Sequence, residues 1–433
     1  MDLLQTQEVS ALKEADRRLA TEIVMGVLRW RGELDFQLGE LSGKVVERLD
    51  AEVATILRMG IYQIQFLERV PKAAAVNEAV ELTKAAHKRS AAGLVNAVLR
   101  KCPTGRGPIR LERFDDLDQA VRASVRRAAP AWLFERWARN FGQVGTAGED
   151  VALRLAWAST QVPPTILRVV DPAQDIGRLR EELAAQGIKT RPGRFSGRAL
   201  VVESGNAQAS QALGQGRVVI QDEASQVVAD LLAPQVGQRV LDLCAAPGIK
   251  AGQMAQTLGR GTLVTCDLSA SRLRTMAKLL PAWLPKGVQW LVVRLDATQA
   301  LPFGCQFERI FLDAPCSGTG TLARNPEIKW RLRLADFERL AETQVKMIKN
   351  ALGSLCLAGR LVYATCSLEP EENEGVVERA MEECPGYQVV SPAELKSAYP
   401  ALSLLFDPQG YLRTRPDLHA MDGFFAAIIV RKN

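Results

Sequence analysis

The chain has 433 residues, enough for two or three domains that each bury a core of their own. Hydrophobic residues make up 47% of it and charged residues 24%, a composition that excludes a disordered or fibrous protein. The formal net charge is a modest +6, and no apolar run approaches the roughly 18 residues that a membrane-spanning helix needs.

The start of the chain and its cysteines bear on the compartment. The first residues are polar and acidic, so no signal peptide is expected. No two cysteines are spaced as Cys-x-x-Cys, and His87 and His419 are far apart, so we expect neither a zinc site nor a disulfide framework. Free thiols suit a reducing cytoplasm, and we predict a cytoplasmic protein. Four cysteines are interpreted as small buried hydrophobes: Cys102, Cys305, Cys356 and Cys384.

Residues 1–142 are predicted to form a helical domain. Apolar residues recur there at helical spacing without strand-like alternation, in the stretches 11–28, 50–67 and 73–86. The glycine- and proline-rich stretch 102–108 ends this block, and a short helix is expected around 130–141.

A basic cluster in this block suggests a nucleic-acid partner. Eight basic residues lie in one stretch, opposed only by Glu112: Lys84, Lys88, Arg89, Arg100, Lys101, Arg106, Arg110 and Arg113. Such a cluster is typical of RNA or DNA binding. A solvated helix face explains the same charges equally well, so charge alone leaves both interpretations open.

The next segment, 143–230, is predicted to form a small α+β module. A helix is expected over 175–186, ended by Gly187. Strand-like stretches are 162–170, 198–203 and 217–221.

From residue 231 onward, strands and helices alternate. The expected strands are 239–243, 262–266, 289–294, 309–312 and 360–363. Alternation of this kind predicts an α/β Rossmann-like core with a doubly wound, mainly parallel sheet. Functional residues are then expected where the strands end.

The segment 240–250 predicts a cofactor site. It reads as a strand, a tight turn of small residues with Gly248, and a helix start that offers unpaired N–H groups to a carboxylate. Asp267 after the next strand is placed to bind a ribose diol, and Asp296 after the third to accept from an adenine amine. This pattern fits S-adenosylmethionine, and the lack of a Gly-x-Gly-x-x-Gly run argues against a dinucleotide. The alternative is that Asp242 and Asp267 only cap helices.

Two cysteines follow later strands. Cys316 ends Leu-Asp-Ala-Pro-Cys, and Cys366 lies in Tyr-Ala-Thr-Cys-Ser. An N-methylating enzyme usually has an aromatic residue where Cys316 stands, and a DNA cytosine enzyme uses that Pro-Cys cysteine as its nucleophile. The second thiol points to RNA instead. Carbon 5 of cytosine is a poor nucleophile, and a thiolate that adds to carbon 6 activates it.

Together, these motifs resemble the Nol/Nop/Sun family of RNA cytosine-C5 methyltransferases, and within it the bacterial ribosomal RNA enzymes. The resembling segments span nearly the whole chain: 77–82, 93–100, 221–226, 324–330, 368–373 and 419–425. The resemblance implies three domains. These are a NusB-like helical RNA-binding domain over 1–142, a linker module over 143–230, and an S-adenosylmethionine-dependent catalytic domain over 231–433.

The resemblance also implies residue roles. Cys366 matches the nucleophile that adds to cytosine carbon 6, and Cys316 matches the second cysteine, associated with breaking the adduct. Asp313 is our candidate for the acid that contacts nitrogen 3 of the ring. A base must remove the C5 proton, and the sequence does not identify it. The implied cofactor positions are Cys244, Ala245, Ala246, Pro247, Gly248, Ile249, Lys250, Asp267, Asp296 and Asp313.

One position departs from the family pattern, because the family usually has glycine where this chain has Ile249. If that position needs a positive φ, isoleucine strains the turn by roughly 1–2 kcal/mol. If it already lies in the first helical turn, isoleucine is tolerated, and we prefer this interpretation.

The resemblance implies that the substrate is small-subunit ribosomal RNA, at cytosine 967 of 16S rRNA. The target base must leave its stack to reach Cys366. Arg324, Lys329 and Trp330 are candidates to contact its neighbours, although Trp330 fits core packing equally well. The same chemistry on tRNA is one alternative. A non-catalytic RNA-binding assembly factor with a decayed turn at Ile249 is another, and retention of both thiols argues against it. We expect a monomer.

Overall fold

The computed structural model describes residues 9, 11–105, 114–142 and 148–432. The chain divides into two compact units. Unit 1 comprises Met1–Val162 and Leu322–Arg331, and unit 2 comprises Pro163–Thr321 and Leu332–Asn433. The predicted boundary at 142 borders the segment 143–147, which lies outside the described residues, so the division into three domains stays a prediction.

Unit 1 is helical over its described residues. Along its first long helix, the buried Val27, Trp30, Leu34 and Leu38 recur every three or four residues, which is the spacing of one helical face. The predicted helical stretches are confirmed, and the first one continues to Ser42. The helices are α2 (Glu14–Ser42), α3 (Ala51–Phe66), α4 (Lys72–Ala85), α5 (Ala92–Lys101), α6 (Gln119–Arg127), α7 (Ala131–Asn140), α8 (Gly148–Thr160) and α14 (Ile328–Arg331).

The basic cluster is partly neutralised within this unit. Lys84 Nζ pairs with Glu81 at 2.7 Å, and Lys88 Nζ pairs with Asp50 at 3.2 Å. Both pairs are what a solvated helix face contains. Exposed members of the cluster are Lys84, Arg89, Arg100 and Lys101. Its remaining members lie outside the described residues: Arg106, Arg110 and Arg113.

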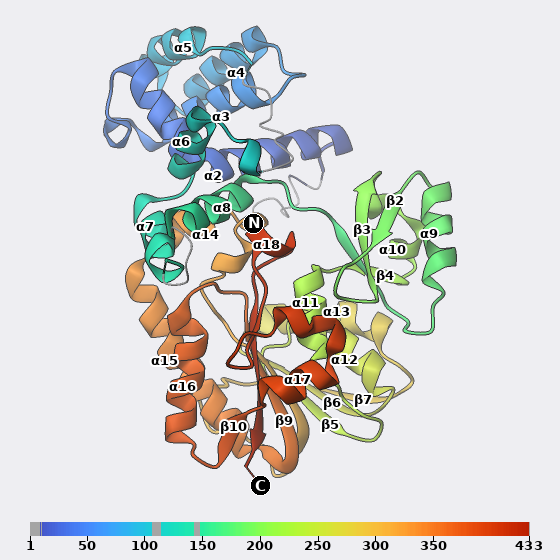
Figure 1. Ribbon diagram of the computed structural model, residues 1–433. Coiled ribbons are helices and arrows are strands. Elements are labelled where there is room, and N and C mark those ends of the chain that lie inside the picture. Colours follow the sequence, from blue (N-terminus) through green and yellow to red (C-terminus); the bar gives the residue numbers. More distant parts are fainter. Residues whose placement is uncertain (1–8, 10, 106–113, 143–147, 433) are drawn as a thin grey trace. The chain divides into compact units, whose positions relative to one another are not determined.

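Residues 322–331 fold with unit 1 although the chain around them belongs to unit 2. Figure 1 shows α14, drawn in orange, among the helices of unit 1. Arg29 of α2 donates to Ala323 O at 3.2 and 2.9 Å, and Lys329 Nζ donates back to Arg29 O at 2.8 Å. Trp330 Nε1 donates to a main-chain carbonyl of α2 at 2.7 Å. Lys329 is 0% exposed, so the prediction that it contacts RNA is wrong. Trp330 is partly buried and bonded to α2, which fits the packing interpretation.

The first part of unit 2 is a small antiparallel sheet in the order β2-β3-β1-β4, which confirms the predicted α+β module. Its helix α9 begins after Asp175, whose side chain accepts from the backbone N–H of Arg178 at 3.1 Å, and ends before Gly187 at φ +76°. The elements are β1 (Ile166–Val169), α9 (Ile176–Ala185), β2 (Lys189–Pro192), β3 (Ala199–Ser204), α10 (Gln211–Gly214) and β4 (Val218–Ile220).

The larger sheet of unit 2 runs in the order β10-β12-β9-β8-β5-β6-β7, with β11 paired to β12. Strands β5 to β9 are mutually parallel, whereas β12 is antiparallel to β9 and to β10. This confirms the predicted Rossmann-like fold with a mainly parallel sheet. The strands are β5 (Arg239–Asp242), β6 (Arg260–Asp267), β7 (Gly287–Arg294), β8 (Phe307–Asp313), β9 (Leu355–Thr365), β10 (Tyr387–Val389), β11 (Leu412–Arg413) and β12 (Phe425–Arg431).

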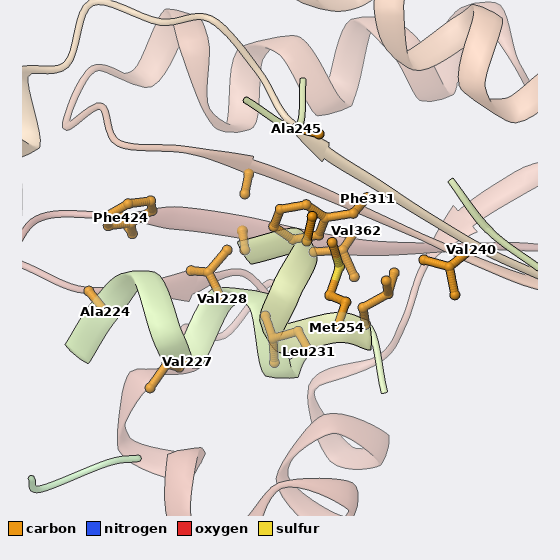
Figure 2. Packing of buried hydrophobic residues seen from close by; sticks show 14 of the residues in the cluster. Ala224, Val227, Val228, Leu231, Val240, Ala245, Met254, Phe311, Val362 and Phe424 are labelled. Atoms are coloured by element: carbon orange, nitrogen blue, oxygen red, sulfur yellow. The ribbon is translucent and has the colours of Figure 1, made fainter. Parts of the chain in front are cut away.

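Helices cover both faces of this sheet (Figure 1). Successive strand residues point to opposite faces, so Phe311 and Val362 join Met254 in one core cluster (Figure 2), while Leu312 and Tyr363 join the other. The helices of unit 2 after the small sheet are α11 (Glu223–Asp230), α12 (Ile249–Leu258), α13 (Ala270–Leu279), α15 (Leu334–Gly353), α16 (Glu374–Glu383), α17 (Pro392–Ala398) and α18 (Pro416–His419). In the described part of the chain, no helix combines the length and apolarity needed to cross a bilayer.

Candidate active site at the carboxyl ends of the parallel strands

The turn between β5 and α12 and the first two residues of α12 hold the predicted cofactor positions 244–250. Gly248 is the N-cap of α12, with φ of +102°, a conformation that favours glycine. A Cβ on Gly248 would lie 2.8 Å from Cγ of the buried Met276, so the position also lacks room for a side chain. Ile249 is the first residue of α12 and its φ is not positive. The preferred interpretation, that isoleucine sits in the first helical turn, is confirmed.

Asp242 ends β5 in a buried position that sequence reasoning did not assign to the site. It is 1% exposed, and neither carboxyl oxygen has a hydrogen-bond partner among the described residues. Burial, and then the negative charge of Asp313, raise the pKa of Asp242 to about 8. A buried acceptor without a partner is costly, so these oxygens suit the hydroxyl and amino donors of a nucleoside-like ligand. Its place at a strand end is the signal that could have identified it.

Asp267 and Asp296 lie at the ends of β6 and β7, as predicted. Asp267 Oδ1 accepts the backbone N–H of Ser269 at 2.8 Å, and its Oδ2 pairs with Arg272 Nη1 at 3.4 Å. Asp296 Oδ1 accepts from the N–H and hydroxyl of Thr298 at 2.9 and 2.7 Å. Each carboxylate therefore stabilises a local turn with one oxygen, whereas the N-cap of α13 is Ser269 rather than Asp267. Their contact with a cofactor stays a prediction.

The two predicted thiols lie together. Cys316 follows β8 and Cys366 follows β9, two neighbouring parallel strands, and their Sγ atoms are 3.3 Å apart. The hydrogen bond with Cys366, burial, and the charges of Cys366, Glu372 and Asp313 raise the pKa of Cys316 well above its ordinary value. Cys316 therefore holds its proton at neutral pH. The pair can present one protonated thiol next to a second sulfur that is free to react.

A lysine–aspartate pair joins the start of α12, at Lys250, to the end of β8, at Asp313. Lys250 Nζ donates to Asp313 Oδ2 at 2.7 Å and lies 5.2 Å from the centre of the Phe424 ring. Burial, the largest single effect, would lower the pKa of Lys250, but the charge and hydrogen bond of Asp313, together with the nearby Cys366 and Asp242, outweigh it, and the pKa is raised. Lys250 therefore stays an ammonium paired with Asp313. A proton donated from this pair would come from Lys250 rather than directly from Asp313.

Glu372 is a third group near the thiols. It lies in the resembling segment 368–373, but the sequence assigned it no role. It is fully buried and accepts hydrogen bonds from the residues that follow Cys316 and Cys366. Its partners lie about 5 and 55 positions away in the chain, so no spacing rule could have assigned them.

The remaining cysteines are less uniform than predicted. Cys102 is buried, and Cys356 and Cys384 are partly buried. Cys305 is exposed, so its interpretation as a small buried hydrophobe is wrong. It lies in the loop before β8, where no helix or strand covers it.

Comparison with known proteins identifies the family of the chain. A family model described as 16S rRNA methyltransferase RsmB/F matches residues 229–430, and a NusB family model matches 1–103. The chain is 33% identical to ribosomal RNA small subunit methyltransferase B of Pseudomonas syringae pv. tomato, over 84% of this chain and 78% of that protein. It is 29% identical to the probable ribosomal RNA small subunit methyltransferase B of Bacillus subtilis, over 97% of this chain and 92% of that one.

Solved structures share the fold. The crystal structure of PH0851 matches with a TM-score of 0.76 and 23% identity, covering 97% of this chain and 91% of that one. NSun6 from Pyrococcus horikoshii, determined with the S-adenosylmethionine analogue SFG, matches with a TM-score of 0.60 and 21% identity, covering 70% of this chain and 99% of that one.

Proposed function

The chain belongs to the RsmB/F family of 16S rRNA methyltransferases, with S-adenosylmethionine as its cofactor, and on that premise we propose that it methylates carbon 5 of a cytosine in 16S rRNA. The family resemblance suggests cytosine 967 as the target. Ribosomal RNA is then the partner, and a monomer remains our expectation.

One observation carries the cytosine-C5 chemistry. Two sulfur atoms lie 3.3 Å apart at the ends of β8 and β9, beside the Lys250–Asp313 ion pair. Methylation of a nitrogen or a hydroxyl needs no thiol, whereas carbon 5 of cytosine becomes a nucleophile only after a thiolate adds to carbon 6. The paired thiols therefore favour the carbon target over the alternatives.

In the proposed addition step, Cys366 attacks as a thiolate after its proton has passed to solvent. The Sγ–C6 bond forms, and the electrons of the C5–C6 double bond move toward nitrogen 3. Lys250 donates a proton to nitrogen 3, and Asp313 stabilises the lysine while this happens. Asp313 is proposed to support this protonation as the partner of the donor, because it accepts from Lys250 at 2.7 Å.

The cofactor supplies the methyl group to the activated carbon 5. Elimination then restores the ring: a base takes the C5 proton, the Sγ–C6 bond breaks with its electrons returning to Cys366, and nitrogen 3 returns its proton to Lys250. Cys316, whose protonated thiol adjoins Cys366, is proposed to act in this release.

The cofactor is proposed to bind along the strand ends that precede the thiols. Positions 244–250 form the turn and the start of α12, and Asp267 and Asp296 accept from the sugar and the base of the cofactor. The unpartnered oxygens of Asp242 add a further acceptor at the same edge. These groups fit the hydroxyl and amino donors of S-adenosylmethionine.

The test is transfer of a labelled methyl group from S-adenosylmethionine to unmodified 16S rRNA, with the nucleosides resolved by mass spectrometry. We expect 5-methylcytidine. Cys366→Ala should abolish transfer, and Cys316→Ala should leave a protein–RNA adduct that survives a denaturing gel. Product with tRNA and none with 16S rRNA would overturn the target and keep the chemistry. Failure with both RNAs and with small-subunit particles would favour the assembly-factor alternative.

A further inference from the structure

Glu372 is a buried carboxylate at the end of a short 3-10 helix, Pro370–Glu372. Its side chain is 0% exposed. One oxygen, Oε1, accepts the backbone N–H of Ser317 at 2.8 Å, and the other, Oε2, accepts the hydroxyl of Ser367 at 2.6 Å. Ser317 directly follows Cys316 and Ser367 directly follows Cys366, so one carboxylate joins the two thiol loops.

Further hydrogen bonds connect the same two loops and hold Glu372 in place. The two serine hydroxyls are 3.0 Å apart. Gln344 of α15 donates to Glu372 Oε1 at 3.2 Å and to Pro315 O, on the other side of Cys316, at 2.8 Å. Tyr363 donates to the main-chain carbonyl of Glu372 at 2.5 Å. Hydrogen bonds to both its side chain and its main chain therefore fix the position of Glu372.

Among the described residues, the donors to this carboxylate are the neutral Ser317, Gln344 and Ser367. Burial raises the pKa of Glu372, so the fold carries a cost that a neutral side chain of similar size would avoid. A buried carboxylate is tolerated where several hydrogen bonds satisfy it, and each of these bonds leads to one of the loops beside the thiols.

We propose that Glu372 is a positioning residue, which ties the Cys316 loop to the Cys366 loop and so sets the spacing of the two thiols. This proposal rests on the proposed function in one respect: the spacing matters because Cys316 must lie beside the Cys366 adduct to act in its release. Glu372 touches neither sulfur, and it acts through Ser317 and Ser367.

The first test measures the spacing without using activity. Diamide oxidises a nearby pair of thiols to a disulfide and is itself reduced to the hydrazine, and peptide mapping identifies the Cys316–Cys366 product. We expect this disulfide to form about tenfold more slowly in Glu372→Ala than in the wild type, because misplacement of paired groups by about 1 Å has effects of this size or larger. Glu372→Gln should recover most of the rate, since its amide can still accept from Ser317 and hydrogen-bond to Ser367.

A matched control separates positioning from loss of a buried carboxylate in general. Glu223 is also buried, and it accepts the backbone N–H groups of Phe195 and Ser196 at 2.5 and 2.9 Å, in a loop of the small module. Glu223→Ala should lower stability and leave the disulfide rate unchanged. An equal rate in Glu372→Ala and the wild type would overturn the proposal. Should Glu372→Ala fail to fold, Ser367→Ala removes one arm of the tether and should slow the disulfide in the same direction.

The second test uses RNA and the same variants. If Glu372 keeps Cys316 in reach, Glu372→Ala should accumulate the covalent protein–RNA adduct, as Cys316→Ala does, while Glu372→Gln releases it. Slow disulfide formation without any adduct in Cys316→Ala would keep the positioning role and reject the proposed chemistry. Normal disulfide formation together with an adduct confined to Cys316→Ala would reject the positioning role and keep the chemistry.

Discussion

The turn before α12 allows the departure from the family pattern to be tested at two adjacent positions. In Gly248→Ala, the left-handed backbone costs about 1–2 kcal/mol. The new Cβ would also lie 2.8 Å from Cγ of Met276, which is 0% exposed and has no room to withdraw. Overpacking of this kind costs about 1–3 kcal/mol. The sum is about 2–5 kcal/mol of unfolding free energy.

In Ile249→Gly, the family residue is restored, yet we expect a loss. Ile249 begins α12 with an ordinary φ and packs, partly buried, on the larger core cluster. Removing a half-buried isoleucine costs about 1 kcal/mol. The added freedom of glycine costs about 0.5–1 kcal/mol more. The total of about 2 kcal/mol corresponds to roughly 4–8 °C in the melting temperature for a unit of this size.

The assay is thermal unfolding by circular dichroism, followed by calorimetric titration with S-adenosylmethionine. Gly248→Ala should unfold at the lower temperature and bind the cofactor more weakly, and Ile249→Gly should bind within about threefold of the wild type, or 0.65 kcal/mol. Gly353→Ala is the matched control, because an added Cβ at Gly353 in α15 meets nothing within 4 Å; it should stabilise by about 0.4–1 kcal/mol. The reasoning fails if Ile249→Gly melts higher than the wild type or binds about tenfold more tightly.

Three further predictions concern buried charges. Burial, with the charge of Arg29, lowers the pKa of Lys329 from 10.5 to about 7. Between these two values the folded state binds fewer protons than the unfolded state, so stability rises with pH. Lys329→Met should flatten this rise, measured by urea titrations at several pH values. Burial raises the pKa of Asp242 from 3.8 to about 8. Between these two values the folded state binds more protons than the unfolded state, so stability falls as pH rises. Asp242→Asn should remove this fall, and an unchanged dependence of stability on pH would contradict the raised pKa of Asp242. Lys250→Met leaves Asp313 without its cation, and methyl transfer in single-turnover assays should fall by about 100-fold or more, with a smaller loss arguing against Lys250 as the proton donor.

Much of the catalytic unit could be predicted from the sequence because its signals are local. Asp267, Asp296 and Cys316 each come at or within three residues of the end of a strand, and parallel strands bring such positions to one edge of a sheet. Cys366 was placed beside Cys316 by the same argument, although the two are 50 positions apart. The first helical turn was preferred for Ile249 because every other block of the family pattern is intact, and α12 does begin at Ile249.

The features that were missed depend on partners far away in the chain. Lys329 reads as a surface lysine beside a tryptophan, and only the fold shows that it donates to Arg29 O, 300 positions earlier. The last strand, β12, is apolar over Phe425–Val430 and buried on both faces, so it has no alternation that would mark its direction. Glu372 lies in an acidic run that reads as solvated surface, and its partners come from three separate elements.

Residues 322–331, which follow the Cys316 loop in the chain, belong to unit 1, but the loop itself is held by hydrogen bonds within unit 2. Gly320 N donates to Cys366 O at 2.9 Å, and Gly320 O accepts from Gly423 N at 2.8 Å. A Cβ on Gly320 would lie 2.0 Å from Gly423 O, so this approach requires glycine.

With the Glu372 tether, these bonds hold the loop on both sides of Cys316 before the chain leaves unit 2. Arg29→Ala removes the donors to Ala323 O and should destabilise unit 1 by about 1–3 kcal/mol, because an acceptor is left unsatisfied. The rate of Cys316–Cys366 disulfide formation should stay within about twofold, since distant sites without shared partners act independently. Gly320→Ala should slow the same disulfide strongly, because the loop must move away from Gly423. A slow disulfide in a folded Arg29→Ala protein would mean that the thiol spacing depends on unit 1, and the tether within unit 2 would then be insufficient.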